Sequence, residues 1–164
     1  MPAHAAVWPA RLPARLSAPA TSLWMNLAIS ALRYPEKVAL VFMGRIWTYR
    51  ELAASAEQLA GQLKALGVQT GDRVVLDMQN CPQLVITHLA TLRIDAVVVP
   101  VNPMNRAEEL KHYITDPDTK VAVTTADLAP DLAQASEALP PEQRLKHLVV
   151  TQFTDVFDPA AVGP

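Results

Sequence analysis

The side chains best suited to chemistry are spread thinly along this chain of 164 residues. The four histidines are His4, His88, His112 and His147. They lie far apart in sequence, and no two have the short spacing of a metal-binding pair on one helix. His88 falls near the apolar side of an expected helix, so we interpret it as a packed histidine and not as a ligand. The histidines therefore predict no metal site.

Cys81 is the single cysteine and directly precedes Pro82 at an expected helix start. A helix N-terminus can lower the pKa of a thiol and make it reactive. Cysteine is also among the residue types most often buried, and we favour a buried structural role. A lone cysteine excludes a disulfide framework and a cysteine-rich zinc site, and it suits a reducing compartment.

Acidic residues and glycines give no stronger sign of a reactive site. Asp116 and Asp118 flank Pro117, where a turn explains both carboxylates without an acid–base role. The glycines are Gly44, Gly61, Gly67, Gly71 and Gly163. Their spacing matches neither glycine-rich phosphate motif, and backbone N–H groups close around a phosphate only where side chains leave room. We therefore expect that this chain alone does not hold the triphosphate of ATP.

The composition is that of one compact domain with a real core. Hydrophobic residues make up 51% of the chain and charged residues 18%, which excludes a disordered chain and suits a buried sheet. The formal net charge is −2 and there is no basic run, so we expect no nucleic acid partner. No apolar stretch approaches the roughly 18 residues that a transmembrane segment needs.

The first twenty residues are rich in alanine and proline and contain Arg11 and Arg15 but no acidic residue. The prolines would break the amphipathic helix of a transit peptide, and no apolar region of a secretory signal follows the arginines. We interpret residues 1–20 as an extended N-terminal arm and expect a cytoplasmic protein.

The next residues predict a helix and a β-hairpin. The helix begins after Thr21 or Ser22 and ends near Arg33, before Pro35. Residues 38–43 and 46–48 form the two strands, with Gly44-Arg45 as a two-residue turn that has glycine first.

Residues 48–67 carry the clearest helix signals. Thr48 and Glu51 have the spacing of a capping box, and Gly67 stands where a helix C-terminus needs a left-handed residue. Apolar residues recur at steps of four and three and so share one face: Leu52, Ala56, Leu59, Leu63 and Leu66.

Strands and helices then alternate. We expect strands at residues 73–78, 96–101, 121–123 and 148–150. Residues 96–101 are continuously apolar, as in a strand buried on both faces. The intervening helices begin at Pro82, after Asn105 with Glu108 as its capping partner, and within residues 126–139. Right-handed crossovers between such strands predict an α/β fold with a mostly parallel sheet, flanking helices and an N-terminal β-hairpin. We expect an α/β subdomain over residues 21–151 and a linker or frayed end over residues 152–164.

Four blocks in this pattern resemble the N-terminal segment of the AMP-forming acyl-CoA synthetases, the adenylate-forming ligases. They are Thr48-Tyr49-Arg50-Glu51-Leu52, Gly71-Asp72-Arg73-Val74, Asn80-Cys81-Pro82 and Val99-Pro100-Val101-Asn102-Pro103. The resemblance covers about residues 21–150. Residues 95–110 are more similar to long-chain or general fatty-acyl ligases than to amino-acid adenylation domains, although Asp95 stands where many relatives have glycine.

The resemblance implies an enzyme that joins a fatty acid to CoA through an acyl-adenylate, using ATP and Mg²⁺ and releasing AMP and pyrophosphate. It also implies that the phosphate loop, the magnesium-associated Glu, the ribose-binding Asp and the catalytic Lys all follow this segment. The chain alone is thus expected to have no catalytic residue and no tightly bound cofactor. The one site that the resemblance suggests is Asn102, Pro103 and Met104, as part of a CoA or acyl entrance. The alternative is that Asn102 and Pro103 only end a strand and prepare a helix.

Two other functions fit the same sequence. One is a non-catalytic interaction domain derived from such a ligase, and the other is the N-terminal part of another adenylating enzyme, such as a peptide-synthetase adenylation domain. The resemblance implies the remainder of a ligase chain and a carboxylic acid substrate as partners. The acyl chain length and a homodimer both stay open.

Overall fold

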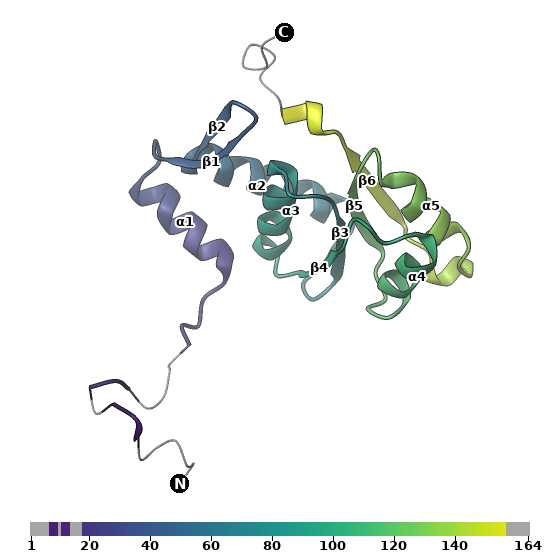
Figure 1. Cartoon of the computed structure of the whole chain (residues 1–164), viewed down its shortest axis with the longest axis horizontal. Coiled ribbons are helices and arrows are strands. Elements are labelled where there is room, and N and C mark those ends of the chain that lie inside the picture. Colours follow the sequence, from purple (N-terminus) through teal and green to yellow (C-terminus); the bar gives the residue numbers. More distant parts are fainter. Residues whose placement is uncertain (1–6, 10, 14–17, 157–164) are drawn as a thin grey trace.

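The computed structural model describes residues 7–9, 11–13 and 18–156. The rest of the predicted arm (residues 1–20) and of the predicted linker (residues 152–164) lies outside the described residues. Figure 1 shows helix α1 (Leu23–Arg33) and the hairpin of β1 (Val38–Phe42) and β2 (Arg45–Thr48) at one end of the molecule. The four-stranded sheet with its helices forms the other end.

The larger sheet is parallel throughout, with strand order β4-β3-β5-β6. Its strands are β3 (Arg73–Asp77), β4 (Val97–Val101), β5 (Val121–Thr125) and β6 (His147–Thr151). The connecting helices are α3 (Pro82–Arg93), α4 (Ala107–Thr115) and α5 (Ala129–Glu137). Single 3₁₀ turns, η2 (Pro141–Gln143) and η3 (Phe153–Val156), precede and follow β6. The predicted α/β fold with a parallel sheet and an N-terminal hairpin is confirmed.

Each face of the sheet is covered by a different pair of helices, because neighbouring side chains along a strand point to opposite faces. Val74 and Leu76 of β3 belong to the core on the side of α2 (Tyr49–Ala65) and α3. Val75, between them, belongs to the core on the side of α4 and α5, with Leu110. A third cluster joins α1 to α2 and α3 around the buried ring of Trp24.

Helix α2 begins and ends as the sequence predicts. The Thr48 N–H donates to the Glu51 carboxylate at 2.8 Å, and the Glu51 N–H donates back to Thr48 Oγ1 at 3.2 Å. Hydrogen bonds from the Thr48 backbone and side chain hold the pKa of Glu51 below its usual value. At the other end Gly67 has φ +91°, and the Val68 N–H donates to the Leu63 carbonyl at 3.1 Å. This bond closes a Schellman motif.

The predicted hairpin turn is wrong by one residue. Phe42 pairs with Arg45, so the two turn residues are Met43 and Gly44. Both have positive φ, 45° and 79°, as a type I′ turn requires. Gly44 is therefore the second turn residue and not the first. A type I′ turn is favoured here because its two positive φ angles match the right-handed twist of the strands.

Strand β4 is an edge strand and is not buried on both faces as its composition suggested. Among the described strands it pairs with β3 alone, and Val97 is half exposed. Continuous apolar sequence cannot distinguish a central strand from an edge strand, because strand order depends on pairing partners. Pro100 fits the edge, since it has no N–H to donate to a further strand.

No helix within the described ranges is both long enough and apolar enough to span a bilayer.

Candidate functional site

The carboxyl ends of the parallel strands lie at one edge of the sheet, where open α/β folds bind ligands. In this chain β3 ends at Asp77, β4 at Val101 and β5 at Thr125. The three following helices begin at the same edge, because each crossover helix runs antiparallel to its strands. The loops there are therefore the candidate functional site.

The predicted residues Asn102, Pro103 and Met104 form the loop between β4 and α4. Asn102 Oδ1 accepts the Met104 N–H at 3.0 Å, and the Asn102 carbonyl accepts the Asn105 N–H at 3.0 Å. These bonds make a compact turn of the Asx type. They also leave the Met104 side chain 81% exposed. The loop is thus ordered by Asn102 and presents an uncovered thioether at the edge of the sheet.

Arg106 caps α4, in place of the predicted Asn105. The Glu109 carboxylate accepts the Arg106 N–H at 2.6 Å, and the predicted partner Glu108 instead forms an ion pair with Lys111. The helix starts one residue later because Asn102 and Asn105 already close the preceding turn. The Arg106 guanidinium donates to the Asp131 carboxylate at 2.9 Å and so joins the starts of α4 and α5. Its side chain is largely exposed and lies two residues after Met104.

Asp77, like Arg106, is a residue of this edge that the sequence analysis did not name. Asp77 is only 2% exposed. The Thr124 hydroxyl donates to the backbone carbonyl of Asp77 at 2.8 Å and lies 3.5 Å from its carboxylate. Burial raises the pKa of Asp77 to about 6, while the Thr124 hydroxyl lowers it and the carboxylates of Asp131 and Asp127 raise it further. The available signal was an acid at the end of the otherwise apolar run Val74-Val75-Leu76.

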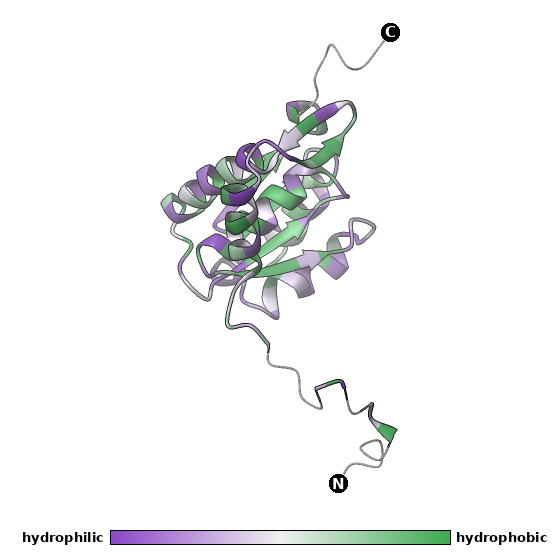
Figure 2. Cartoon of the chain, turned by 90° about the vertical axis from the view of Figure 1, so that its left-hand side faces the viewer, coloured by the Kyte–Doolittle hydropathy of each residue, from purple (hydrophilic) through white to green (hydrophobic). Residues whose placement is uncertain are grey.

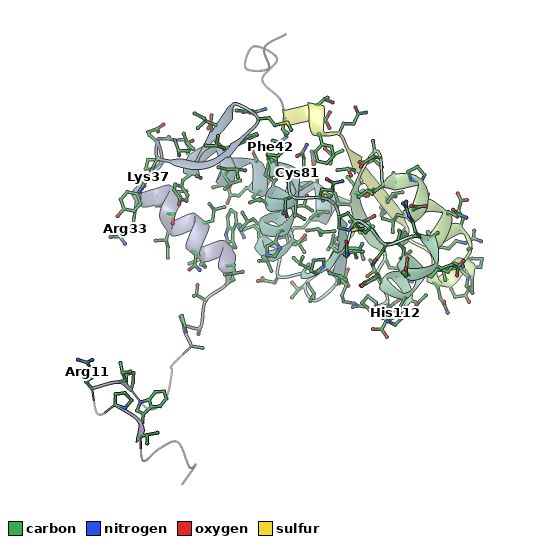
Figure 3. The ribbon with its side chains drawn as sticks, in the orientation of Figure 1. Arg11, Arg33, Lys37, Phe42, Cys81 and His112 are labelled. Carbon is green, nitrogen blue, oxygen red and sulfur yellow. The ribbon has the colours of Figure 1, made fainter. Side chains whose placement is uncertain are left out.

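Cys81 and Gln83 lie on the other face of the edge, at the start of α3. Cys81 is buried in the core that Phe42 also contacts, and burial raises the pKa of its thiol (Figure 3). The structural interpretation of Cys81 is thereby confirmed. Gln83 Nε2 donates to the Gln152 carbonyl at 2.7 Å and so connects α3 to the end of β6.

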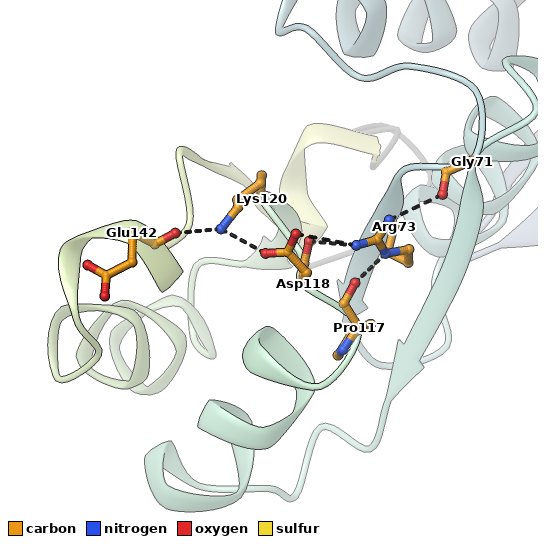
Figure 4. Close-up of polar contacts among 6 residues, drawn as sticks. All are labelled: Gly71, Arg73, Pro117, Asp118, Lys120 and Glu142. Atoms are coloured by element: carbon orange, nitrogen blue, oxygen red, sulfur yellow. Dashed lines mark hydrogen bonds and ion pairs between the residues drawn. The ribbon is translucent and has the colours of Figure 1, made fainter.

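The predicted turn at Asp116 and Asp118 lies at the opposite, amino-terminal edge. Figure 4 shows Arg73 donating to the carbonyls of Gly71, Pro117 and Asp118. Lys120 donates to the Glu142 carbonyl at 2.7 Å and pairs with Asp118 at 2.9 Å, which lowers the pKa of Asp118. The charges around Asp118 therefore hold a turn with φ +51° in place.

Among the described residues, no group of three or more histidine, cysteine, aspartate or glutamate side chains could hold a metal ion. The carboxyl edge therefore offers an ordered loop, a guanidinium and a buried carboxylate. A nucleophile paired with a base is missing from these described residues.

The family model of the AMP-binding enzymes matches residues 27–162. The chain belongs to the AMP-binding enzyme family. This match includes the hairpin, the whole parallel sheet and the Asn102–Met104 loop. It covers most of the chain, so the resemblance seen in the four sequence blocks is confirmed.

Two curated relatives of this AMP-binding chain are long-chain-fatty-acid–CoA ligases. The one from Bacillus subtilis (strain 168) is 35% identical over 125 residues, which is 76% of this chain and 22% of the relative. The one from Yersinia pestis is 32% identical over 155 residues, or 93% of this chain and 27% of the relative. A solved structure of a putative long-chain-fatty-acid CoA ligase from Rhodopseudomonas palustris CGA009 superposes with a TM-score of 0.73 at 27% identity, covering 85% of this chain and 37% of that one. The chain thus spans about a quarter of the length of these curated relatives.

Proposed function

We propose that this chain is the N-terminal part of an AMP-forming fatty acid–CoA ligase, over residues 21–151, preceded by an arm and followed by a linker. The observation that carries the proposal is the AMP-binding match over residues 27–162, with fatty-acid ligases among its relatives. The whole enzyme would use ATP, CoA and Mg²⁺ to convert an acid to its acyl-CoA. The single buried cysteine supports a reducing compartment, and we propose a cytoplasmic location.

The chain's own contribution is to position the entrance of the site. We assign Asn102, Pro103 and Met104 to the CoA or acyl entrance, where Met104 offers an apolar contact. Arg106, next to this loop, carries a largely exposed guanidinium that suits a phosphate group. The guanidinium also pairs with the Asp131 carboxylate at 2.9 Å, so a phosphate group would share or displace this contact.

The bond-making groups of the reaction would come from residues outside this chain. The described carboxyl edge has no lysine and no glycine-rich loop, and Asp77 is too enclosed to reach a substrate. The 164-residue chain should therefore fail to exchange labelled pyrophosphate into ATP with any fatty acid. The ligase encoded by the complete gene should catalyse this exchange with fatty acids. Pyrophosphate exchange that depends on a fatty acid in the 164-residue chain would contradict the proposal. Exchange by the complete ligase with amino acids but not with fatty acids would also contradict it.

The entrance assignment is tested separately by Met104→Glu in the complete ligase. A carboxylate beside Arg106 competes for the guanidinium and repels an anionic ligand, so we expect KM for CoA to rise about tenfold with kcat changed less than about twofold. Val97→Glu is the matched control, because Val97 is half exposed at the start of β4, whereas the Met104 loop follows the end of that strand. Equal KM values for the two variants would remove this loop from the entrance.

A further inference from the structure

The amino-terminal edge of the parallel sheet carries a row of basic side chains. β3, β5 and β6 are neighbours, and in their register Val74 pairs with Val121, which pairs with His147. The residues immediately before these three are all basic: Arg73, Lys120 and Lys146. Neighbouring strands lie about 4.8 Å apart, so three like charges come close together at this edge. The strands beyond the row are largely hydrophobic (Figure 2), and the row therefore forms the polar boundary of the sheet.

A hollow of about 300 Å³ lies at this edge, beside the C-terminus of α2. The three basic residues of the row line it together with His147. The buried side chains of Val68 and Val121 also belong to its lining. Small-molecule sites in proteins range upward from about this volume. The hollow thus has room for a small ligand.

Two of the basic side chains are already bonded to the protein. Figure 4 shows that the Arg73 guanidinium donates to three backbone carbonyls. Lys120 donates to the Glu142 carbonyl and pairs with Asp118, which uses two of the three N–H donors of its ammonium group. These bonds hold the wall of the hollow in place and leave one Lys120 donor for a ligand.

Lys146 and His147 differ from this pair. Within residues 7–9, 11–13 and 18–156, neither side chain forms a hydrogen bond or an ion pair. Their backbone N–H groups both donate to the Lys120 carbonyl, at 2.8 and 3.2 Å, so the two residues are held next to Lys120. An ammonium group has three N–H donors and an imidazole at least one. The hollow therefore offers unused donors from two adjacent residues.

The charge of the hollow favours an anion. Two acids, Asp72 and Asp118, stand among three lysine and arginine side chains, whereas the whole chain has a formal net charge of −2. Both acids are already engaged, because Asp72 accepts the Gln69 N–H at 2.9 Å and Asp118 pairs with Lys120. The hydrogen bond and charge of Lys120 lower the pKa of Asp118, and the charge of Lys146 lowers it further. The remaining positive charge of Lys146 is thus available to a ligand.

We propose that this hollow binds a phosphate group, with Lys146, His147 and the remaining donor of Lys120 as its hydrogen-bond donors. Phosphate suits these groups because its oxygens accept several hydrogen bonds at once, and bonds to a charged donor are the strong ones. The inference does not rest on the proposed function. The hollow lies at the edge of the sheet opposite to the loop of residues 102–104, and all its lining residues lie within residues 66–147.

The phosphate group has two possible sources, which are inorganic phosphate and a small phosphate ester. An ester could place its organic part on the apolar lining of Val68 and Val121. The small volume of the hollow limits that part to a few carbon atoms.

An NMR titration of the isotope-labelled 164-residue chain tests the site, with the ionic strength held constant by sodium chloride. The probes are inorganic phosphate and glycerol phosphate. We expect saturable shifts of the backbone amides around the hollow, in residues 66–73, 118–121 and 146–147. Tighter binding of glycerol phosphate would identify an ester as the ligand, and tighter binding of inorganic phosphate would identify the free ion. Either ranking supports the phosphate site.

Lys146→Gln should weaken phosphate binding about tenfold, because it removes a charge-assisted hydrogen bond. Lys64→Gln is the matched control, since Lys64 is also an exposed lysine but lies outside the lining of the hollow. This control should change the affinity less than about twofold, because a distant exposed charge is screened by salt. Both variants should keep the dispersed spectrum of the folded chain, as both side chains are exposed.

Three results would overturn the phosphate site. The first is a titration in which the shifts never saturate. The second is a set of saturable shifts that all lie outside the amides around the hollow. The third is an equal loss of affinity in the Lys146→Gln and Lys64→Gln variants, because the binding would then depend on net charge alone.

Discussion

Replacing Asp77 by asparagine should stabilise the fold, and more so at higher pH. The folded state raises the pKa of this carboxyl from 3.8 to about 6, chiefly through burial. Between these values the unfolded chain releases the proton and the folded chain retains it. Stability therefore falls as pH rises from about 4 to 6, and the loss persists above pH 6. The Asp77→Asn variant has no proton to lose at this position, and the amide oxygen of its new side chain can still accept from Thr124.

The expected size follows from the shift of about two pKa units, at about 1.4 kcal/mol for each. At pH 8, where Asp77 is ionised in both states, the raised pKa lowers the free energy of unfolding by about 3 kcal/mol. At pH 4.5 the folded carboxyl is still protonated, and the free energy of unfolding is lowered by only about 1 kcal/mol. The free energy gained by Asp77→Asn should thus be about 2 kcal/mol larger at pH 8 than at pH 4.5. Using this difference cancels any pH-independent effect of the amide on packing.

Urea unfolding measures this difference, with the fluorescence of the buried rings Trp24 and Trp47 as the signal. Asp95→Asn is the control, because Asp95 is exposed in a turn with φ +57° that asparagine tolerates. This control variant shows how much the loss of one negative charge changes the free energy of unfolding at each pH. A gain from Asp77→Asn that is equal at the two pH values, or no larger than that of the control, would refute the account of Asp77 as a buried ionised carboxylate.

Two further predictions concern the ends of α2. Thr48→Ala should cost about 1 kcal/mol of unfolding free energy at pH 7, because it removes the hydroxyl that accepts the Glu51 N–H. The Thr48 hydroxyl also donates to the Glu51 carboxylate, whose pKa is lowered in the folded state, so this part of the cost should be lost as pH falls through that folded pKa. A cost from urea titrations that stays the same from pH 7 into the acid range would contradict this account. Gly67→Ala should destabilise by about 1 kcal/mol or more, since φ is +91° there. Gly61→Ala, inside the helix with nothing within 4 Å of the added Cβ, should stabilise by up to about 1 kcal/mol, and a thermal melt that ranks the two glycine variants in the opposite order would contradict the helix-end geometry.

Predictions from sequence succeeded where a few neighbouring residues decide the structure. The Thr48–Glu51 box, the Gly67 terminus and the Pro82 helix start all depend on atoms within about one helical turn. The α/β class followed in the same way from the alternation of strands and helices. The hairpin turn and the cap of α4 were each misplaced by one residue, because neighbouring turns compete for the same backbone groups.

The sequence could not predict features that depend on which strands become neighbours. β4 is apolar throughout but lies at an edge, and Asp77 resembles any acid at a strand end until β5 places Thr124 beside it. The contact between Arg106 and Asp131 joins residues from two crossovers. The three predicted entrance residues do lie together at the carboxyl edge, and their role there stays a prediction.

By itself the sequence determined the family and the local elements of this chain, because caps, turns and apolar periodicity act over short distances. Tertiary structure alone decided the rest. Sheet order and helix packing bury Asp77, pair Arg106 with Asp131 and leave an apolar stripe of α1 exposed among the described residues. Burial raises a pKa, and exposure makes an apolar stripe available for binding, only after distant segments have come together.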